Sequence, residues 1–101
     1  MSDFKGSKGP WLISDESEKW NRIVDANGGL ITTCYAMQNE DDANARLIAA
    51  APELLKALQD MLSGWQYIRK QHGDLYGVGW DRAEQKAVSA INKALGKGTD
   101  K

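Results

Sequence analysis

The stretch that decides the fold is "ANARLIAAAPELLKAL", residues 43–58, an alanine-rich apolar run with Pro52 in its middle. A proline inside a helix removes one backbone hydrogen bond and clashes with the preceding turn, which costs about 3 kcal/mol. At the first turn of a helix no N–H is needed, so proline is tolerated there. The run therefore predicts two helices that meet at Ala51, one over residues 41–50 and one over residues 52–71.

The second of these helices carries the main apolar stripe of the chain. Large apolar side chains recur there at every third or fourth residue, which is the period of one helix face. Burial of one such side chain contributes roughly 1.5–3 kcal/mol, more than a cap or an ion pair. The stripe consists of Leu54, Leu55, Leu58, Met61, Leu62, Trp65 and Ile68. We expect it to form the helical part of the core.

A third helix is predicted after the glycine-rich loop at residues 72–79. Asp81 and Glu84 have the spacing of a capping box, with Asp in the place of the usual Ser or Thr. Gly96 is a natural residue for the end of that helix. Between these limits Ala87, Val88, Ile91, Ala94 and Leu95 are expected to point inward.

A small antiparallel sheet is predicted ahead of the helices. "GPW" at residues 9–11 suits the start of an edge strand, because proline donates no backbone hydrogen bond. β-branched and aromatic residues on both sides of Asn27-Gly28 predict a hairpin with strands at 20–25 and 30–37. Alternation along the second strand places Ile31, Thr33, Tyr35 and Met37 on one face and Leu30, Thr32, Cys34 and Ala36 on the other. The helices should cover one of these faces and leave the other open to solvent or to another subunit.

The expected fold is therefore α+β, with an antiparallel hairpin or three-stranded meander followed by two or three helices packed on one face. The chain has 101 residues, which is enough for one domain with a small core. We place that domain at residues 10–96, between a flexible N-terminal arm at 1–9 and a frayed C-terminus at 97–101. A domain of this size gains stability from oligomerisation.

Composition excludes several classes of function. Hydrophobic residues make up 42% and charged residues 27%, which is typical of a folded globular chain. The net charge of -1 is dispersed, so no footprint for a nucleic acid is present. No apolar run reaches the roughly 20 residues of a membrane-spanning helix. A single cysteine, Cys34, and an N-terminus without an apolar signal region favour a reducing cytoplasm.

The sequence also lacks the combinations of residues that catalysis needs. His72 is the only histidine and has no Ser or Cys partner at a recognisable spacing. Residues 40–42 are acidic but do not have the spacing of a calcium loop, and no Cys/His cluster suits zinc. "GDLYGVGW" at 73–80 lacks the lysine of a phosphate-binding loop. The chain is therefore predicted to be no enzyme and to need neither a cofactor nor a metal.

Binding is the remaining class, and its candidate residues are polar or aromatic. Arg46 and Asn44 interrupt the alanine-rich helix, whose small side chains let a flat ligand approach. The five donors of an arginine fork suit a phosphate or a carboxylate. An ion pair between Arg46 and Asp42, four residues earlier on the same face, is the alternative. The aromatic candidates for stacking are Trp11, Tyr35, Tyr76 and Trp80, each of which has packing as its alternative role.

At these residues the chain resembles a group of short accessory proteins of tailed bacteriophages and prophages. The resemblance is carried by "GPW" at 9–11, by D-x-x-G at 25–28 and by the long motif at 43–58, and it covers the first two thirds of the chain. It implies a phage-encoded protein made in the host bacterial cytoplasm, with no defined activity. By analogy with that class, small non-enzymatic phage proteins often act against host defence.

Two functional hypotheses follow from these residues and from the resemblance. In the first, a homo-oligomer holds a nucleotide-derived immune signal in a subunit-interface pocket lined by Asn44 and Arg46. Arg46 holds the phosphate, and Trp11, Tyr35 or Trp80 stacks on the base. In the second, the chain inhibits a host defence enzyme by covering it with the open sheet face or with aromatic residues. A structural or assembly factor is a third interpretation.

Overall fold

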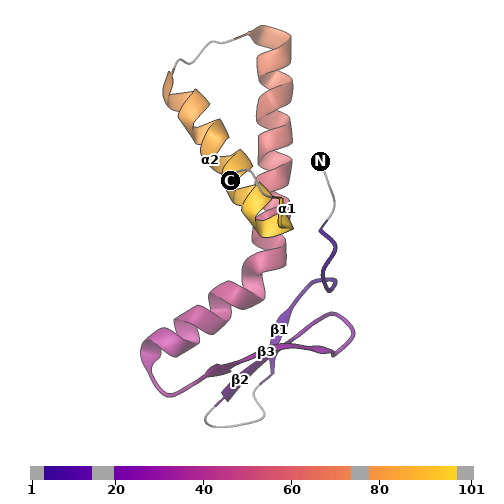
Figure 1. Ribbon diagram of the computed structural model, residues 1–101, viewed down its shortest axis with the longest axis vertical. Helices are drawn as coiled ribbons and strands as arrows, with labels where there is room; N and C mark the ends of the chain where they lie inside the picture. Colours follow the sequence, from indigo (N-terminus) through magenta and orange to yellow (C-terminus); the bar gives the residue numbers. More distant parts are fainter. Residues whose placement is uncertain (1–3, 15–19, 74–77, 98–101) are drawn as a thin grey trace. The chain divides into compact units, whose positions relative to one another are not determined.

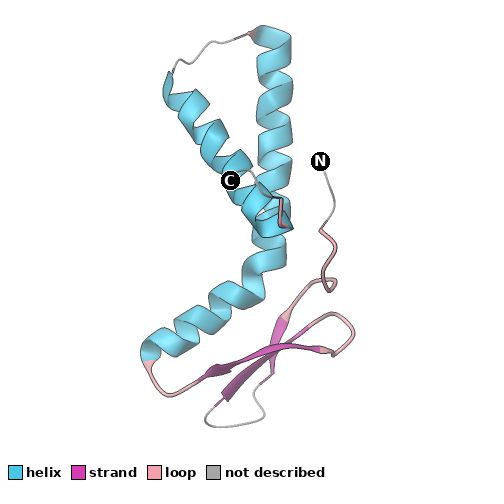
Figure 2. Ribbon diagram, viewed as in Figure 1, coloured by secondary structure: helices cyan, strands magenta, loops and turns pink. Residues whose placement is uncertain are grey.

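The computed structural model describes residues 4–14, 20–73 and 78–97, and these form a three-stranded sheet followed by two helices (Figure 1). In chain order the elements are β1 (Leu12–Ser14), β2 (Trp20–Val24), β3 (Leu30–Tyr35), α1 (Asn39–His72) and α2 (Val78–Leu95). The strands precede both helices along the chain, and Figure 2 distinguishes strands from helices by colour. The predicted α+β class is confirmed. Neither helix contains a window long and apolar enough to cross a lipid bilayer.

The chain divides into two compact units, and α1 contributes to both. Residues Gly6–Leu54 form the first, which we call the sheet unit because it contains all three strands and the beginning of α1. Residues Met1–Lys5 and Leu55–Lys101 form the second, which we call the hairpin unit because it contains the rest of α1 and all of α2. The single domain expected over residues 10–96 stays a prediction.

The predicted break before Pro52 is wrong, because α1 is one helix that contains this proline. The ring of Pro52 packs against Gly9 within the sheet unit. A Cβ atom added at Gly9 would lie 2.9 Å from Cβ of Pro52, closer than real Cβ contacts come. This tertiary contact offsets part of the roughly 3 kcal/mol that an interior proline costs a helix. Local propensity is a weak determinant of structure where such packing exists.

The sheet has the antiparallel order β1-β2-β3, and its hairpin turn confirms the Asn27-Gly28 prediction. One carboxylate oxygen of Asp25 accepts the backbone N–H groups of Asn27 at 2.9 Å and Gly29 at 2.8 Å. Gly28 has φ 85°, the left-handed conformation that glycine adopts at little cost. The Asp25 side chain therefore holds the turn that sets the register of β2 against β3.

A β-bulge in the hairpin changes which residues share a face. Ile23 lies opposite Thr32, but the next residue, Val24, lies opposite Leu30, so Ile31 is the extra residue. Directly opposed residues share a face, and successive residues alternate, so Leu30 lies with Val24 on the face away from Thr32. The prediction that Leu30 and Thr32 share a face is therefore wrong, because alternation alone does not reveal a bulge.

The first turns of α1 cover one face of the sheet, which we call the inner face. Ile23 and Asn21 on this face are buried, with exposed fractions of 0% and 8%. The side-chain amide of Asn21 donates to Oδ1 of Asp42 at 3.1 Å, and Ala45, one turn further along α1, has 0% exposure. An alanine at that position brings the helix backbone close to the strands. One face of the sheet is thereby buried and the other is left open.

The segment before β1 makes one internal hydrogen bond and one to the hairpin of the sheet. The indole N–H of Trp11 donates to the carbonyl oxygen of Ser7 at 3.1 Å. The backbone N–H of Ala26 donates to the carbonyl oxygen of Lys8 at 3.1 Å. Within the arm predicted to be flexible, residue 8 is therefore tied to the turn between β2 and β3, and residue 7 to Trp11.

In the hairpin unit, α2 packs against one side of α1. Leu62 of α1 and Ile91 of α2 are the buried large side chains of this unit, with exposed fractions of 4% and 3%. The helix ends as predicted at Gly96, whose φ is 77°. Its N–H donates to the carbonyl of Lys93 at 3.2 Å, and that of Lys97 donates to the carbonyl of Asn92 at 2.8 Å. This pair of bonds is the Schellman arrangement.

The apolar stripe predicted for the core is only partly buried. Leu54, Met61 and Ile68 have exposed fractions of 52%, 73% and 42%. Within the hairpin unit, Leu62 is buried, whereas Met61 and Ile68 line the open part of an apolar groove beside α2. The prediction is wrong for these residues because an apolar stripe wider than one helix contact was assigned wholly to the core.

The close approach of Gly9 to Pro52 predicts opposite effects for two glycine substitutions. Gly9→Ala is expected to lower the free energy of unfolding by about 1–3 kcal/mol, because the new methyl group overpacks the contact. Gly64→Ala is the matched control, since an added Cβ there meets nothing within 4 Å. It should raise the free energy of unfolding by up to about 1 kcal/mol through helix propensity. Urea unfolding measures both, and a neutral Gly9→Ala would contradict the contact.

Candidate binding surfaces

The face of the sheet opposite the inner face carries a stacked aromatic pair. Trp20 of β2 lies directly opposite Tyr35 of β3. Their ring centroids are 4.9 Å apart with an interplanar angle of 27°. Trp20 is 40% exposed and Tyr35 is 60% exposed. The two rings therefore order one another while keeping much of their surface in solvent.

Other residues extend this surface, which we call the outer face. Register and alternation assign to it Leu12, Ser14, Trp20, Arg22, Val24, Leu30, Thr33 and Tyr35. Arg22 lies in the middle of one row across the sheet, opposite Ser14 of β1 on one side and Thr33 of β3 on the other. Leu12 and Leu30 are 57% and 54% exposed. Aromatic residues and arginine, without any acidic residue among these eight, match the composition of protein interfaces.

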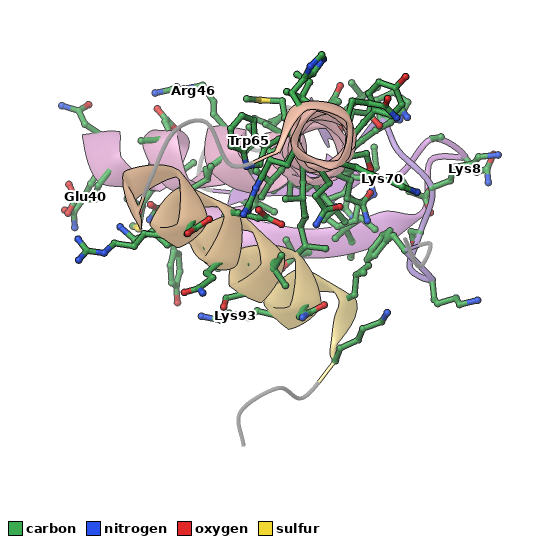
Figure 3. The ribbon with its side chains drawn as sticks, turned by 90° about the horizontal axis from the view of Figure 1, so that it is seen from above. Lys8, Glu40, Arg46, Trp65, Lys70 and Lys93 are labelled. Atoms are coloured by element: carbon green, nitrogen blue, oxygen red, sulfur yellow. The ribbon has the colours of Figure 1, made fainter. Side chains whose placement is uncertain are left out.

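Arg46 and Asn44, the polar residues predicted to bind a ligand, are both exposed on α1. The side chain of Arg46 extends outward from the helix (Figure 3). Among the described residues it makes no ion pair, and Asp42 accepts from Asn21 instead. The ion pair between Arg46 and Asp42, considered as the alternative role of Arg46, is therefore absent.

The aromatic residues predicted to stack on a ligand are not gathered around Arg46. Tyr35 lies on the outer face, whereas Arg46 belongs to the helix that covers the inner face. Trp11 is half-buried ahead of β1, with its indole N–H bound to Ser7. Tyr76 lies outside the described residues, and for Trp80 the structure describes the backbone in α2 but not the side chain. Within a single copy of the sheet unit, Tyr35 and Arg46 therefore do not line a common pocket.

Sequence reasoning did not single out Trp20, although a signal for it was present. Trp20 precedes Asn27 by seven residues, and Tyr35 follows Gly28 by seven residues. Equal spacing on the two sides of Asn27-Gly28 therefore indicates that these rings lie opposite one another, and the register of the strands confirms it. Counting outward from the turn finds the aromatic pair, whereas examining each aromatic residue alone does not.

A polar cluster, which we call the clamp, joins the two helices of the hairpin unit. The guanidinium of Arg69 on α1 forms ion pairs with Asp81, at 3.0 Å, and with Glu84. The side-chain amide of Gln66 donates to Glu84 at 3.0 Å. The predicted capping box is therefore wrong: α2 begins at Val78, and its two acids bind the other helix.

The clamp sets the ionisation of Glu84. The hydrogen bond from Gln66 is the largest cause that lowers the pKa of Glu84, and the hydrogen bond and charge of Arg69 lower it further, while burial opposes them. The carboxylate form is thus favoured in the folded state. No nucleophile belongs to this cluster, and no described group of three His, Cys, Asp or Glu residues is placed to hold a metal ion. The clamp is suited to holding α2 on α1.

The lowered pKa of Glu84 predicts a pH-dependent contribution to stability. The pKa of Glu84 in the folded state lies below its unfolded value of about 4.3. The stabilisation that ionised Glu84 gives the fold is therefore complete above about pH 4.3, and it is lost as pH falls through the folded pKa. Glu84→Gln should lower the free energy of unfolding at pH 7 by about 1–3 kcal/mol, and the difference from wild type should shrink in acid. Urea titrations at several pH values measure this. Glu53→Gln, an exposed control on α1, should change stability by less than about 0.5 kcal/mol.

These features define a small α+β protein with one sheet face buried and the other aromatic and open. The chain belongs to the family described as Salmonella phage P22 protein Y8K6, whose model matches residues 1–98. The phage origin inferred from the resemblance is thereby supported over nearly the whole chain. No curated protein and no solved structure matches the chain.

Proposed function

We propose that the chain is a phage-encoded, non-enzymatic binding protein that blocks a host defence protein by covering it with the outer face. The observation that carries the proposal is the Trp20–Tyr35 pair, stacked and exposed on the sheet face that α1 leaves open. Membership of a phage protein family supports this proposal, and we place the chain in the cytoplasm of the infected host.

The physical argument concerns the free energy of ordering side chains on binding. Tryptophan, tyrosine and arginine are the residue types that most often dominate the energy of protein interfaces. Immobilising a side chain at an interface costs free energy. Because Trp20 and Tyr35 already restrict one another by stacking, less of this free energy is lost when a partner binds. The strands hold Arg22 beside the pair in a fixed register. The outer face is therefore a preorganised binding surface.

Charge indicates what kind of partner fits this surface. The chain has a net charge of -1, which gives no extended acidic surface of the kind that imitates DNA. Arg22 is the one charged residue among the eight of the outer face, surrounded by aromatic, aliphatic and hydroxyl groups. The complementary partner is therefore a protein with an apolar patch.

Site-specific photo-crosslinking tests this proposal in phage-infected host cells. A photoreactive residue at Thr33, which is exposed on the outer face, should give one dominant crosslink to a host protein, identified by mass spectrometry. The same residue at Lys56, on the exposed side of α1, should not. In the chain that carries the photoreactive residue at position 33, the additional substitution Tyr35→Ala should remove the crosslink. Equal crosslinking from both positions would contradict a role for the outer face.

A second candidate function is sequestration of a nucleotide-derived immune signal by a homo-oligomer. The observation that favours it is Arg46, whose exposed guanidinium makes no ion pair among the described residues, with Asn44 exposed two residues away. A guanidinium in this state is available to a phosphate. Because Tyr35 and Arg46 do not meet within one sheet unit, stacking and phosphate binding in one pocket require a second copy.

Calorimetric titration distinguishes this second candidate from the first. If it holds, a cyclic di- or trinucleotide or an ADP-ribose derivative binds the purified chain, and Arg46→Ala weakens binding at least about tenfold, as expected for the loss of a charge-assisted hydrogen bond. Lys70→Ala, an exposed cation at the other end of α1, is the control and should bind as wild type does. Absence of heat with every nucleotide tested would leave protein binding as the function.

A further inference from the structure

The hairpin unit has an apolar groove along one side of its two helices. The groove has a volume of about 500 Å³ and is lined almost entirely by carbon. The lining residues are Leu58, Met61, Leu62, Gly64, Trp65 and Ile68 of α1 and Ala83, Glu84 and Ala87 of α2. Met61 is 73% exposed and Ile68 is 42% exposed. Contiguous apolar surface of this kind marks an interaction site on a soluble protein.

The spacing of these residues indicates that the occupant is helical. On α1 the large residues fall at 58, 61, 65 and 68, alternating steps of three and four. On α2, alanines fall at 83, 87, 90 and 94, again in steps of four and three. Alternating steps of three and four are the seam of a coiled coil, in which side chains of one helix enter spaces on another. Leu62 and Ile91 are already buried, whereas Met61, Ile68 and most of these alanines are exposed, so the two seams remain for other helices.

The two walls of the groove are complementary to each other in size. The α1 wall carries large apolar side chains, whereas the apolar residues of the α2 wall are the small ones, Ala83 and Ala87, next to Glu84. A two-fold axis parallel to the helices would lay α1 of one copy over α2 of a second copy. The large side chains of each copy would then fill the space above the alanines of the other, and the contact would occur twice, as in an isologous interface.

The charges at the rims of the groove fit the same arrangement. Asp60 lies beyond the large residues of α1, and its exposed ion pair with Lys56, at 3.5 Å, contributes little. Lys86 and Lys93 lie beyond the alanines of α2, and Lys93 projects from the side of α2 away from α1 (Figure 3). In the two-fold arrangement, Asp60 of one copy faces the basic rim of the other. We propose that this groove is a homodimer interface, in which two hairpin units form a four-helix bundle.

This interface differs from the homo-oligomer expected from the sequence, which placed the contact at Arg46. It is also independent of the proposed function, because it lies in the other unit from the outer face. A dimer built this way presents two outer faces, so a partner with repeated sites is bound at two points.

Sedimentation equilibrium of the full chain tests the interface, with the wild type expected to be dimeric. Met61→Lys and Ile68→Lys should each raise the dissociation constant at least about tenfold, since each places a charge in the apolar seam. Helix content by circular dichroism should not change, because both side chains are already exposed. Tyr67→Lys is the matched control, since Tyr67 is 65% exposed on the same helix but does not line the groove. A wild-type monomer, or an equal loss with Tyr67→Lys, would overturn the proposal.

Charge reversal tests the two-fold pairing itself. Asp60→Lys alone, and Lys86→Glu with Lys93→Glu, should each weaken the homodimer, because like charges then meet at both rims. An equimolar mixture of the two variants should restore dimerisation as a heterodimer in which both rims pair opposite charges. If the mixture associates no more tightly than either variant alone, the two-fold arrangement is contradicted.

Discussion

The hydrogen bond from Asn21 to Asp42 is the constraint on which the sheet unit depends. It joins the middle strand to the first turn of α1, and one turn later Ala45 is fully buried. A charge-assisted bond at a half-buried position is worth more than a neutral one in solvent. Because α1 is held on the inner face in this way, Trp20 and Tyr35 remain on the face that it does not cover. The candidate binding surface is therefore a consequence of where the helix docks.

The contact between Gly9 and Pro52 explains two parts of the sequence that look unrelated when read alone. "GPW" and the long alanine-rich motif are about forty residues apart, yet glycine from the first packs against proline from the second. A side chain at residue 9 has no room there, and the ring at residue 52 finds a partner that compensates for its cost in the helix. These motifs are accordingly two sides of one packing contact within the sheet unit.

The sequence predicted the elements that local chemistry controls. The Asn27-Gly28 turn, the edge strand after Pro10 and the helix end at Gly96 follow from backbone preferences of single residues, and all three are present. The predictions from sequence failed where contacts between residues far apart in the chain determine the structure. Pro52 continues a helix because Gly9 accommodates it, Asp81 and Glu84 bind Arg69 instead of capping α2, and a bulge moves Leu30 to the outer face. Of the candidate site, Tyr35 was anticipated, whereas its pairing with Trp20 required counting residues outward from the turn.

A double-mutant cycle on Asn21 and Asp42 tests the docking of α1 most directly. Urea unfolding of the wild type, Asn21→Ala, Asp42→Ala and the double variant gives the coupling free energy between the two side chains. The structure predicts a favourable coupling of about 1–2 kcal/mol, since the bond has one charged partner and lies partly buried. If the changes in the free energy of unfolding caused by the two single substitutions are strictly additive, this bond does not hold α1 on the inner face. That result would contradict the assignment of the outer face as the open side of the sheet.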